Sequence, residues 1–235
     1  MTAAEIIEQI RPLGLESYKK VMFKHGAVEP LFGVKIEELK KIQKKIKKDY
    51  QLALDLYDTG IYDAMYLAGL IADDEKMTKK DLRKWIKKAH CPGIQEYTVP
   101  WVAAEGLYGW EMALEWIESK EEGVAAAGWQ TLSSLVSIKD NSELDLEALA
   151  KLLEQIPKKI HKQPNRVRYT MNGFVIAVGS YVSELSDLAI KTAEAVGEVY
   201  VNMGETECKV PSAPEYIEKA KKRGSLTKKR KSAKC

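Results

Sequence analysis

The chain has 235 residues, of which 45% are hydrophobic and 30% charged, with a formal net charge of +3. This is enough apolar material for a sizeable core in either one domain or two, and we expect one continuous array. No apolar run reaches the roughly 18 to 20 residues that a membrane span needs, and the acidic, amphipathic start from Met1 to Ile10 is unlike a signal peptide, so we expect a cytoplasmic protein that does not enter a membrane.

The three cysteines and three histidines are scattered and lack the spacing of a metal site. An odd number of cysteines without C-x-x-C spacing also argues against a disulfide framework. We therefore expect no metal and no cofactor. These residues are Cys91, Cys208, Cys235, His25, His90 and His161.

Amphipathic spacing predicts helices along almost the whole chain. Leu39, Ile42 and Ile46 form one apolar stripe with lysines around it, and Gly60 is expected to end the next helix. Thr78 and Asp81 resemble a capping box that opens a helix through Lys88. Further helices are predicted at 63–72, 96–107, 111–119, 124–138, 146–156, 167–182, 185–195 and 215–222.

A helical pattern recurs along the chain with drifting spacing. The matching positions are separated by steps of 29, 31 and 39 residues, which suits stacked helix pairs that bury their apolar faces against each other. They are Leu56-Tyr57, Trp85-Ile86, Trp116-Ile117 and Gln155-Ile156. We predict an all-α, HEAT-like solenoid over residues 1–222, a monomer of about six helix pairs, with a concave face that holds an extended ligand.

Basic charge is concentrated toward the two ends. Residues 219–235 hold nine Lys or Arg and no acid, and we expect 223–235 to be a disordered basic tail. Residues 105–154 hold eleven acids and three bases, which opposes tight binding of a duplex along the middle. The candidate phosphate contacts are Lys44 and Lys48 in the lysine-rich segment 40–48, and Lys228, Lys229, Arg230 and Lys231 in the tail.

The spacing of Tyr97, Trp101, Glu105 and Tyr108 places them on one predicted helical face. An indole binds a cationic group through its π face, and a carboxylate one turn later stabilises positive charge or positions a water. Trp101 and Glu105 are therefore candidate site residues, with Tyr97 beside them. The alternative is that Trp101 packs in the core while Glu105 is solvated.

Six segments together resemble the DNA alkylation repair family, the AlkD-type HEAT-like glycosylases. They are Phe32 to Lys35, Leu56 to Gly60 with Ala68 to Asp73, Trp101-x-x-x-Glu105, Asn172 to Phe174, and Thr206 to Pro211. The resemblance spans about residues 15 to 220. It implies a helical solenoid that holds duplex DNA and hydrolyses the N-glycosidic bond of purines alkylated at N3 or N7, without a metal.

At the positions that match the family's motifs, the resemblance implies that Glu105 is the catalytic carboxylate and that Trp101 and Phe174 are base or sugar contacts. The chain departs from the family at each point. Glu105 stands where the family has Asp, Phe174 stands where it has a second Trp, and Val124 to Ala127 stand where it has a pair of phosphate-binding arginines. An extended carboxylate and a lost phosphate clamp both work against catalysis.

Two main hypotheses follow. The first is a DNA glycosylase with an altered active site that acts on alkylated purines. The second is a non-catalytic HEAT-like module that binds nucleic acid through the lysines of residues 40–48 and the tail. A scaffold that binds a basic protein partner through the acidic middle is a third possibility.

Overall fold

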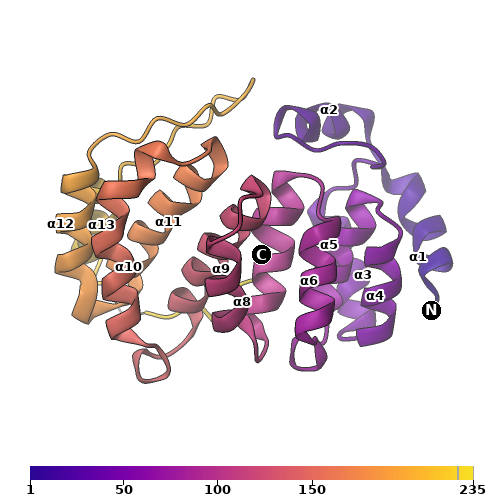
Figure 1. Ribbon diagram of the computed structural model, residues 1–235. Helices are drawn as coiled ribbons and strands as arrows, with labels where there is room; N and C mark the ends of the chain where they lie inside the picture. The colour runs from indigo at the N-terminus through magenta and orange to yellow at the C-terminus, as the bar shows by residue number, and fades with distance from the viewer. Residues whose placement is uncertain (227, 235) are drawn as a thin grey trace. The chain divides into compact units, whose positions relative to one another are not determined.

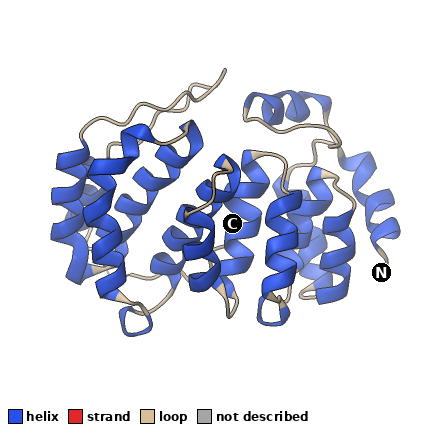
Figure 2. Ribbon diagram, in the orientation of Figure 1, coloured by secondary structure: helices blue, strands red, loops and turns tan. Residues whose placement is uncertain are grey.

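The computed structural model describes residues 1–226 and 228–234, and the regular secondary structure of this part of the chain is helical, with loops between the helices (Figure 2). The all-α prediction is confirmed. The helices form two compact units. Unit 1 comprises residues 1–108, 204–206 and Lys234, and unit 2 comprises 109–203 and 207–233 (Figure 1).

Unit 1 contains seven of the α-helices that the structure describes, and its two capping boxes explain where two of them begin. In each, a threonine hydroxyl accepts from a main-chain N–H three residues later while an acidic side chain accepts in return, at Thr2 with Glu5 and at Thr78 with Asp81. The second box confirms the sequence prediction. The helices are α1 (Ala3–Ile10), α2 (Glu16–Lys24), α3 (Ile36–Ile46), α4 (Tyr50–Asp58), α5 (Tyr62–Ile71), α6 (Lys79–Lys88) and α7 (Val99–Glu105).

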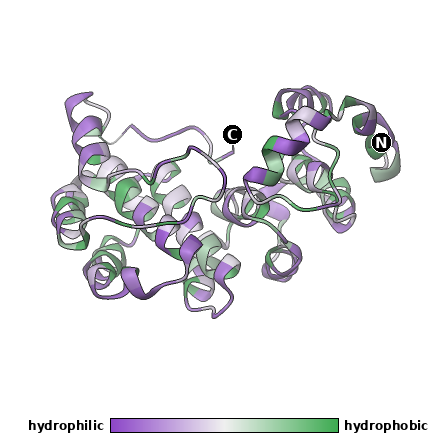
Figure 3. Ribbon diagram, turned by 90° about the horizontal axis from the view of Figure 1, so that it is seen from above, coloured by the Kyte–Doolittle hydropathy of each residue, from purple (hydrophilic) through white to green (hydrophobic). Residues whose placement is uncertain are grey.

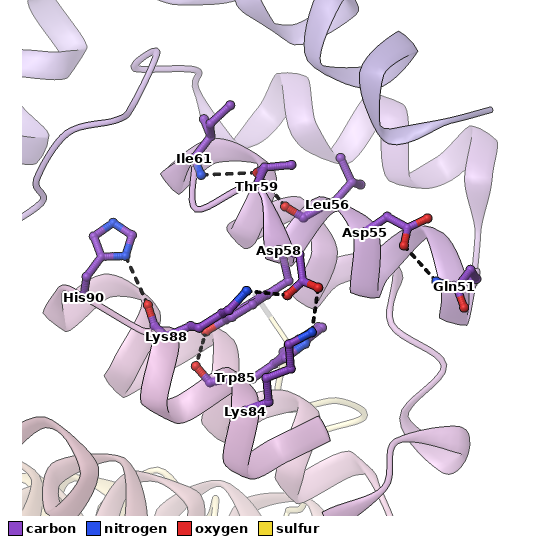
Figure 4. A network of polar contacts seen from close by, with 11 residues as sticks. Gln51, Asp55, Leu56, Asp58, Thr59, Ile61, Lys84, Trp85, Lys88 and His90 are labelled. Carbon is purple, nitrogen blue, oxygen red and sulfur yellow. Dashed lines mark hydrogen bonds and ion pairs between the residues drawn. The ribbon is translucent and has the colours of Figure 1, made fainter. Parts of the chain in front are cut away.

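The first two matching positions of the sequence repeat touch each other. The rings of Tyr57 and Trp85 stack with centroids 4.0 Å apart, and the Tyr57 hydroxyl donates to the Trp85 carbonyl at 2.8 Å. On the surface beside this stack, Lys84 and Lys88 of α6 donate to Asp58 of α4 at 2.6 and 2.8 Å (Figure 4). The repeated position therefore joins neighbouring helix pairs, as the spacing indicates.

Unit 2 is built around α9, which packs against α8 and α11. The small residues of α9 allow this close approach, because a Cβ at Gly128 would lie 2.6 Å from the main-chain nitrogen of Ile117. Most of these helices carry a hydrophobic and a hydrophilic side (Figure 3). The helices are α8 (Gly109–Ile117), α9 (Glu122–Ile138), α10 (Leu146–Lys159), α11 (Asn165–Tyr181), α12 (Ser186–Val196) and α13 (Ala213–Lys222).

The helix predicted over 96–107 differs in the structure. Residues Ile94–Thr98 form a π-helical segment, η3, and α7 then runs only from Val99 to Glu105. Pro100 has no N–H to donate and its ring crowds the preceding turn, which accounts for the widened turn. Tyr108 lies beyond the end of α7, and the Lys79 ammonium lies 5.2 Å from its ring centroid.

Residues of the segment after α13, which the sequence predicts to be a disordered tail, make hydrogen bonds to other residues. Within unit 2 the Arg230 N–H donates to the Ser137 carbonyl at 2.7 Å, and the Lys229 ammonium donates to the Val136 carbonyl at 2.8 Å. Ala233 is buried. These contacts give specific main-chain partners to residues whose composition alone indicates disorder. Thr227 and Cys235 of the predicted tail lie outside the described residues.

Within residues 1–226 and 228–234, no single helix has both the length and the apolar character needed to cross a membrane. In the same residues, α11 and the helical stretch 183–196 are long and apolar enough only when taken together, and they are bent by 116° with respect to each other. The same part of the chain contains no group of three or more His, Cys, Asp or Glu side chains placed to hold a metal ion.

Candidate functional site

Trp101, the aromatic residue predicted to meet a ligand, is enclosed by two tyrosines of unit 1. Its ring contacts Tyr66 edge-on with centroids 5.6 Å apart, and Tyr97 at 6.0 Å with the planes tilted by 59°. Only 4% of Trp101 is exposed, whereas Tyr97 is 40% exposed. The core alternative for Trp101 therefore agrees with the structure, and Tyr97 is the aromatic of this group that presents a surface.

Glu105 is the last residue of α7 and is partly exposed. The next residue, Gly106, ends the helix so close to the η2 turn (Asp74–Lys76) that a Cβ there would lie 2.7 Å from the Asp74 carbonyl oxygen. Burial is the main reason why the pKa of the Asp74 carboxyl group is raised, and the charge of the Glu105 carboxylate adds a smaller contribution in the same direction. The candidate catalytic carboxylate therefore belongs to a larger acidic site.

Asp74 is the centre of that site, and sequence analysis missed it. The Lys234 ammonium lies 2.7 Å from its Oδ1, donates a hydrogen bond to its Oδ2 at 2.9 Å and donates another to the Ala72 carbonyl at 3.3 Å. Lys48 lies 3.5 Å from Oδ2. Burial raises the pKa of Asp74, and the charge of Lys234 opposes that shift. Acidic residues in a turn such as Asp73-Asp74-Glu75 are expected to be exposed to water, so no local sequence signal indicates that Asp74 pairs with Lys234.

Phe174, predicted as the second base or sugar contact, is fully buried in unit 2. Its ring lies 5.3 Å from that of Trp129, between α11 and α9. A side chain in this position reaches no ligand. The neighbouring residues of α9, from Ala125 to Ala127, are buried as well, so this stretch supplies packing at the place where the resemblance implies an arginine pair.

Two of the motifs that carry the family resemblance have structural roles within their own units. In unit 2 the Asn172 side chain donates to the Pro211 carbonyl at 2.9 Å, which connects the Asn172 motif to the last residue of the Thr206–Pro211 motif. In unit 1 the Asp63 carboxylate accepts from the N–H groups of Phe32 and Val34. Both contacts pair buried polar side chains with main-chain groups, so these residues hold loops in place.

The basic side chains differ in how they are engaged. In α3 and the residues after it, Lys41 pairs with Glu38 and Lys48 with Asp74. In the described part of the chain no ion pair holds the other lysines of this segment, Lys40, Lys44, Lys45 and Lys47. In the last residues, Lys228, Arg230 and Lys231 are exposed, while Lys229 is partly buried and burial lowers the pKa of its ammonium group.

Comparison with known proteins decides the family. The family model described as "DNA alkylation repair enzyme" matches residues 6–217. The chain belongs to this family. It is 34% identical over 209 residues to "Uncharacterized protein Lin0241" of Listeria innocua serovar 6a, covering 87% of this chain and 90% of the relative. It is 33% identical over 209 residues, with the same coverage, to "Uncharacterized protein Lmo0209" of Listeria monocytogenes serovar 1/2a.

A solved structure gives the same fold. It is described as "A new family of proteins related to the HEAT-like repeat DNA glycosylases with affinity for branched DNA structures", and it matches with a TM-score of 0.92 and 34% identity over 100% of both chains. The HEAT-like fold and the family resemblance expected from the sequence are confirmed. Within this fold, the member described here encloses Trp101 and Phe174 in its cores.

Proposed function

We propose that the protein is a DNA-binding member of the DNA alkylation repair family that recognises branched DNA and does not hydrolyse N-glycosidic bonds. Of the two main hypotheses, this is the non-catalytic one. We include in the proposal a monomeric state and a cytoplasmic location.

The burial of Trp101 and Phe174, the two aromatic residues that the resemblance implies as base or sugar contacts, is the single observation that supports this choice. Excision of an alkylated purine without a metal needs an aromatic face against the cationic nucleotide and a carboxylate aimed at the sugar. Trp101 instead packs between Tyr66 and Tyr97, and Phe174 packs on Trp129. Neither Trp101 nor Phe174 therefore presents an exposed ring that could hold a base.

Binding of DNA is supported by the lysines at the end of α3. Lys44, Lys45 and Lys47 are exposed and carry no ion pair in the described part of the chain. Lysines at a helix C-terminus also complement its dipole, so part of their role is structural. Exposed ammonium groups in one short segment still provide the phosphate contacts that dominate affinity for nucleic acid.

Recognition of branched DNA is supported by the solved relative, whose description names affinity for branched DNA structures. That protein shares 34% of its residues with this chain over the full length of both. This shared scaffold is the basis on which we extend the ligand class of the relative to the chain.

The experiment compares binding with catalysis in one preparation. Fluorescence anisotropy with a labelled four-way junction and a linear duplex of the same length measures affinity, and release of free base from methylated duplex measures hydrolysis. We expect tighter binding to the junction, no released alkylpurine at high protein concentration, and unchanged binding for Glu105→Gln. Base release that Glu105→Gln abolishes would restore the glycosylase hypothesis.

A charge-matched pair of variants tests the α3 surface. Lys44→Gln/Lys45→Gln should reduce the dependence of log affinity on log salt by about 1.8, the value for two lost phosphate contacts. Lys151→Gln/Lys158→Gln removes the same charge from exposed positions of α10. Equal effects of the two double variants would show that only net charge matters and would remove α3 as the interface.

A further inference from the structure

Arg168 in α11 of unit 2 is a half-buried cation whose charge no protein group balances. Its Nε is enclosed, and among residues 1–226 and 228–234 this atom has no hydrogen-bond acceptor and the guanidinium has no carboxylate partner. An arginine stays charged at any physiological pH, and an enclosed donor without an acceptor is unfavourable for the fold. The packing of unit 2 therefore gives no reason for an arginine at this position, whereas a bound anion would.

The surroundings of Arg168 are held in place by contacts within unit 2 that leave its own donors unused. Asn165, one turn earlier, donates to the Asn202 carbonyl at 2.9 Å and accepts from the Asn202 N–H at 2.7 Å. Asn172, one turn later, donates to the Pro211 carbonyl at 2.9 Å. Residues three or four positions apart are neighbours on a helix, so Arg168 lies between two fixed points.

The next residue, Tyr169, is a half-buried aromatic that borders open space. The Arg166 guanidinium lies over its ring, 4.5 Å from the centroid. One turn further along, Gly173 has no side chain, and a Cβ there would meet no atom within 4 Å. Because a helical side chain covers the turn that precedes it, the glycine leaves the surface next to Tyr169 uncovered.

We propose that Arg168 and Tyr169 bind one unpaired nucleotide at the branch point of a DNA. The Arg168 guanidinium takes the phosphate, for which its planar fork of donors is suited, and the Tyr169 ring stacks on the base. The inference rests on the proposed DNA binding and names the part of the branched ligand that unit 2 recognises. Unpaired nucleotides expose base faces that a linear duplex keeps stacked, so this site favours branched DNA.

Substitution of Gly173 tests the stacking site without changing any charge. Gly173→Leu places a side chain in the open space next to Tyr169, and leucine favours a helix more than glycine does, so α11 should stay intact. Ser180→Leu is the matched control, because it adds the same side chain seven residues later on the same, partly exposed face of α11.

The measurement is fluorescence anisotropy with a labelled three-way junction that carries unpaired nucleotides at its branch point. Gly173→Leu should weaken binding by roughly 5- to 50-fold, the scale of one base stacked on an aromatic ring. Ser180→Leu should bind as the wild type does. Unchanged binding of Gly173→Leu, or an equal loss in both variants, would overturn the proposal.

Substitution of Arg168 separates a ligand contact from a packing role. Arg168→Met should weaken junction binding and lower the dependence of log affinity on log salt by about 0.9, the value for one phosphate contact. It should not lower stability in urea, because no protein acceptor loses a partner. Lys191→Met is the control for charge, since Lys191 is exposed on α12. Lost stability with unchanged binding, or equal binding losses in both variants, would overturn the proposal.

The wild-type protein distinguishes failure of this site from failure of the proposed function. If it binds neither the junction nor a linear duplex of the same length, the proposed DNA binding fails and the nucleotide site fails with it. If it binds the junction and both Gly173→Leu and Arg168→Met bind equally well, the nucleotide site alone fails.

Discussion

The Asp63 carboxylate accepts a hydrogen bond from the Phe32 N–H at 2.6 Å, across 31 residues of sequence. Its other oxygen accepts from the Val34 N–H at 2.7 Å. Gly33 between them has a φ of +76°, a conformation that favours glycine. Burial raises the pKa of Asp63, and the main-chain hydrogen bonds oppose that shift. The Phe32-Gly33-Val34 motif of the family is therefore a loop shaped around one buried carboxylate.

Asp63→Asn should destabilise unit 1. An amide keeps one acceptor oxygen, but its NH₂ group then faces a main-chain N–H, and we expect a loss of about 1–3 kcal/mol in the free energy of unfolding. Urea denaturation measures this loss. Asp187→Asn is the control, because Asp187 is 88% exposed, and a surface change of this kind should stay within about 0.5 kcal/mol. Equal losses in both variants would contradict the role given to Asp63.

The pairing of Asp58 with two lysines predicts a pH dependence of stability. Burial raises the pKa of Asp58, but hydrogen bonds from Lys84 and Lys88 outweigh it, and the net pKa is lowered. A carboxyl group whose pKa is lower in the folded state contributes stability above its unfolded pKa and loses it as the pH falls through the folded pKa.

The stability difference between wild type and Asp58→Asn should therefore be constant from pH 7 to about 5 and shrink below about pH 4. Urea denaturation at pH 7, 5 and 3.5 measures it. In a background of Lys84→Met/Lys88→Met, the same substitution should show a smaller effect of pH. A difference that grows on acidification would contradict this assignment.

Alanine substitutions at two glycines should change the stability of the protein in opposite directions. A Cβ at Gly128 would meet main-chain atoms of α8, with the Ile117 nitrogen at 2.6 Å, whereas a Cβ at Gly173 in α11 meets no atom within 4 Å. Gly128→Ala should destabilise the protein because the helices must separate. Gly173→Ala should stabilise it by about 0.5–1 kcal/mol through a more restricted unfolded chain. Thermal denaturation of the two variants checks both signs, and a gain from Gly128→Ala would contradict the close packing.

Phe174 should behave as a core residue. Phe174→Ala removes a fully buried ring beside Trp129, and we expect a loss of about 3–5 kcal/mol in stability. Phe23→Ala is the matched control, because Phe23 is 41% exposed and the same change there should cost less than about 1 kcal/mol. Chemical denaturation compares them. A stable Phe174→Ala protein with weakened DNA binding would instead return Phe174 to the ligand site.

Local patterns predicted much of the fold, because the signals for helices lie within a few residues of one another. The Thr78–Asp81 box begins α6, and the stripe at Leu39 and Ile42 is the buried side of α3. The Pro100 turn was missed because one proline changes a hydrogen-bond pattern without changing hydrophobic spacing. The contact between Lys234 and Asp74 was missed because 160 residues separate the partners, and no periodicity connects them. Burial of Trp101 depends on Tyr66, which belongs to another helix.

The burial of tryptophan has a practical consequence for spectroscopy. Trp85, Trp101, Trp116 and Trp129 are each at most 7% exposed. Their emission should be blue-shifted and poorly quenched by iodide, and it should shift to longer wavelength on unfolding. The fifth tryptophan, Trp110, is partly exposed. The four buried indoles are therefore good reporters of denaturation and poor ones of bound DNA, so a titration is better followed with a dye on the nucleic acid.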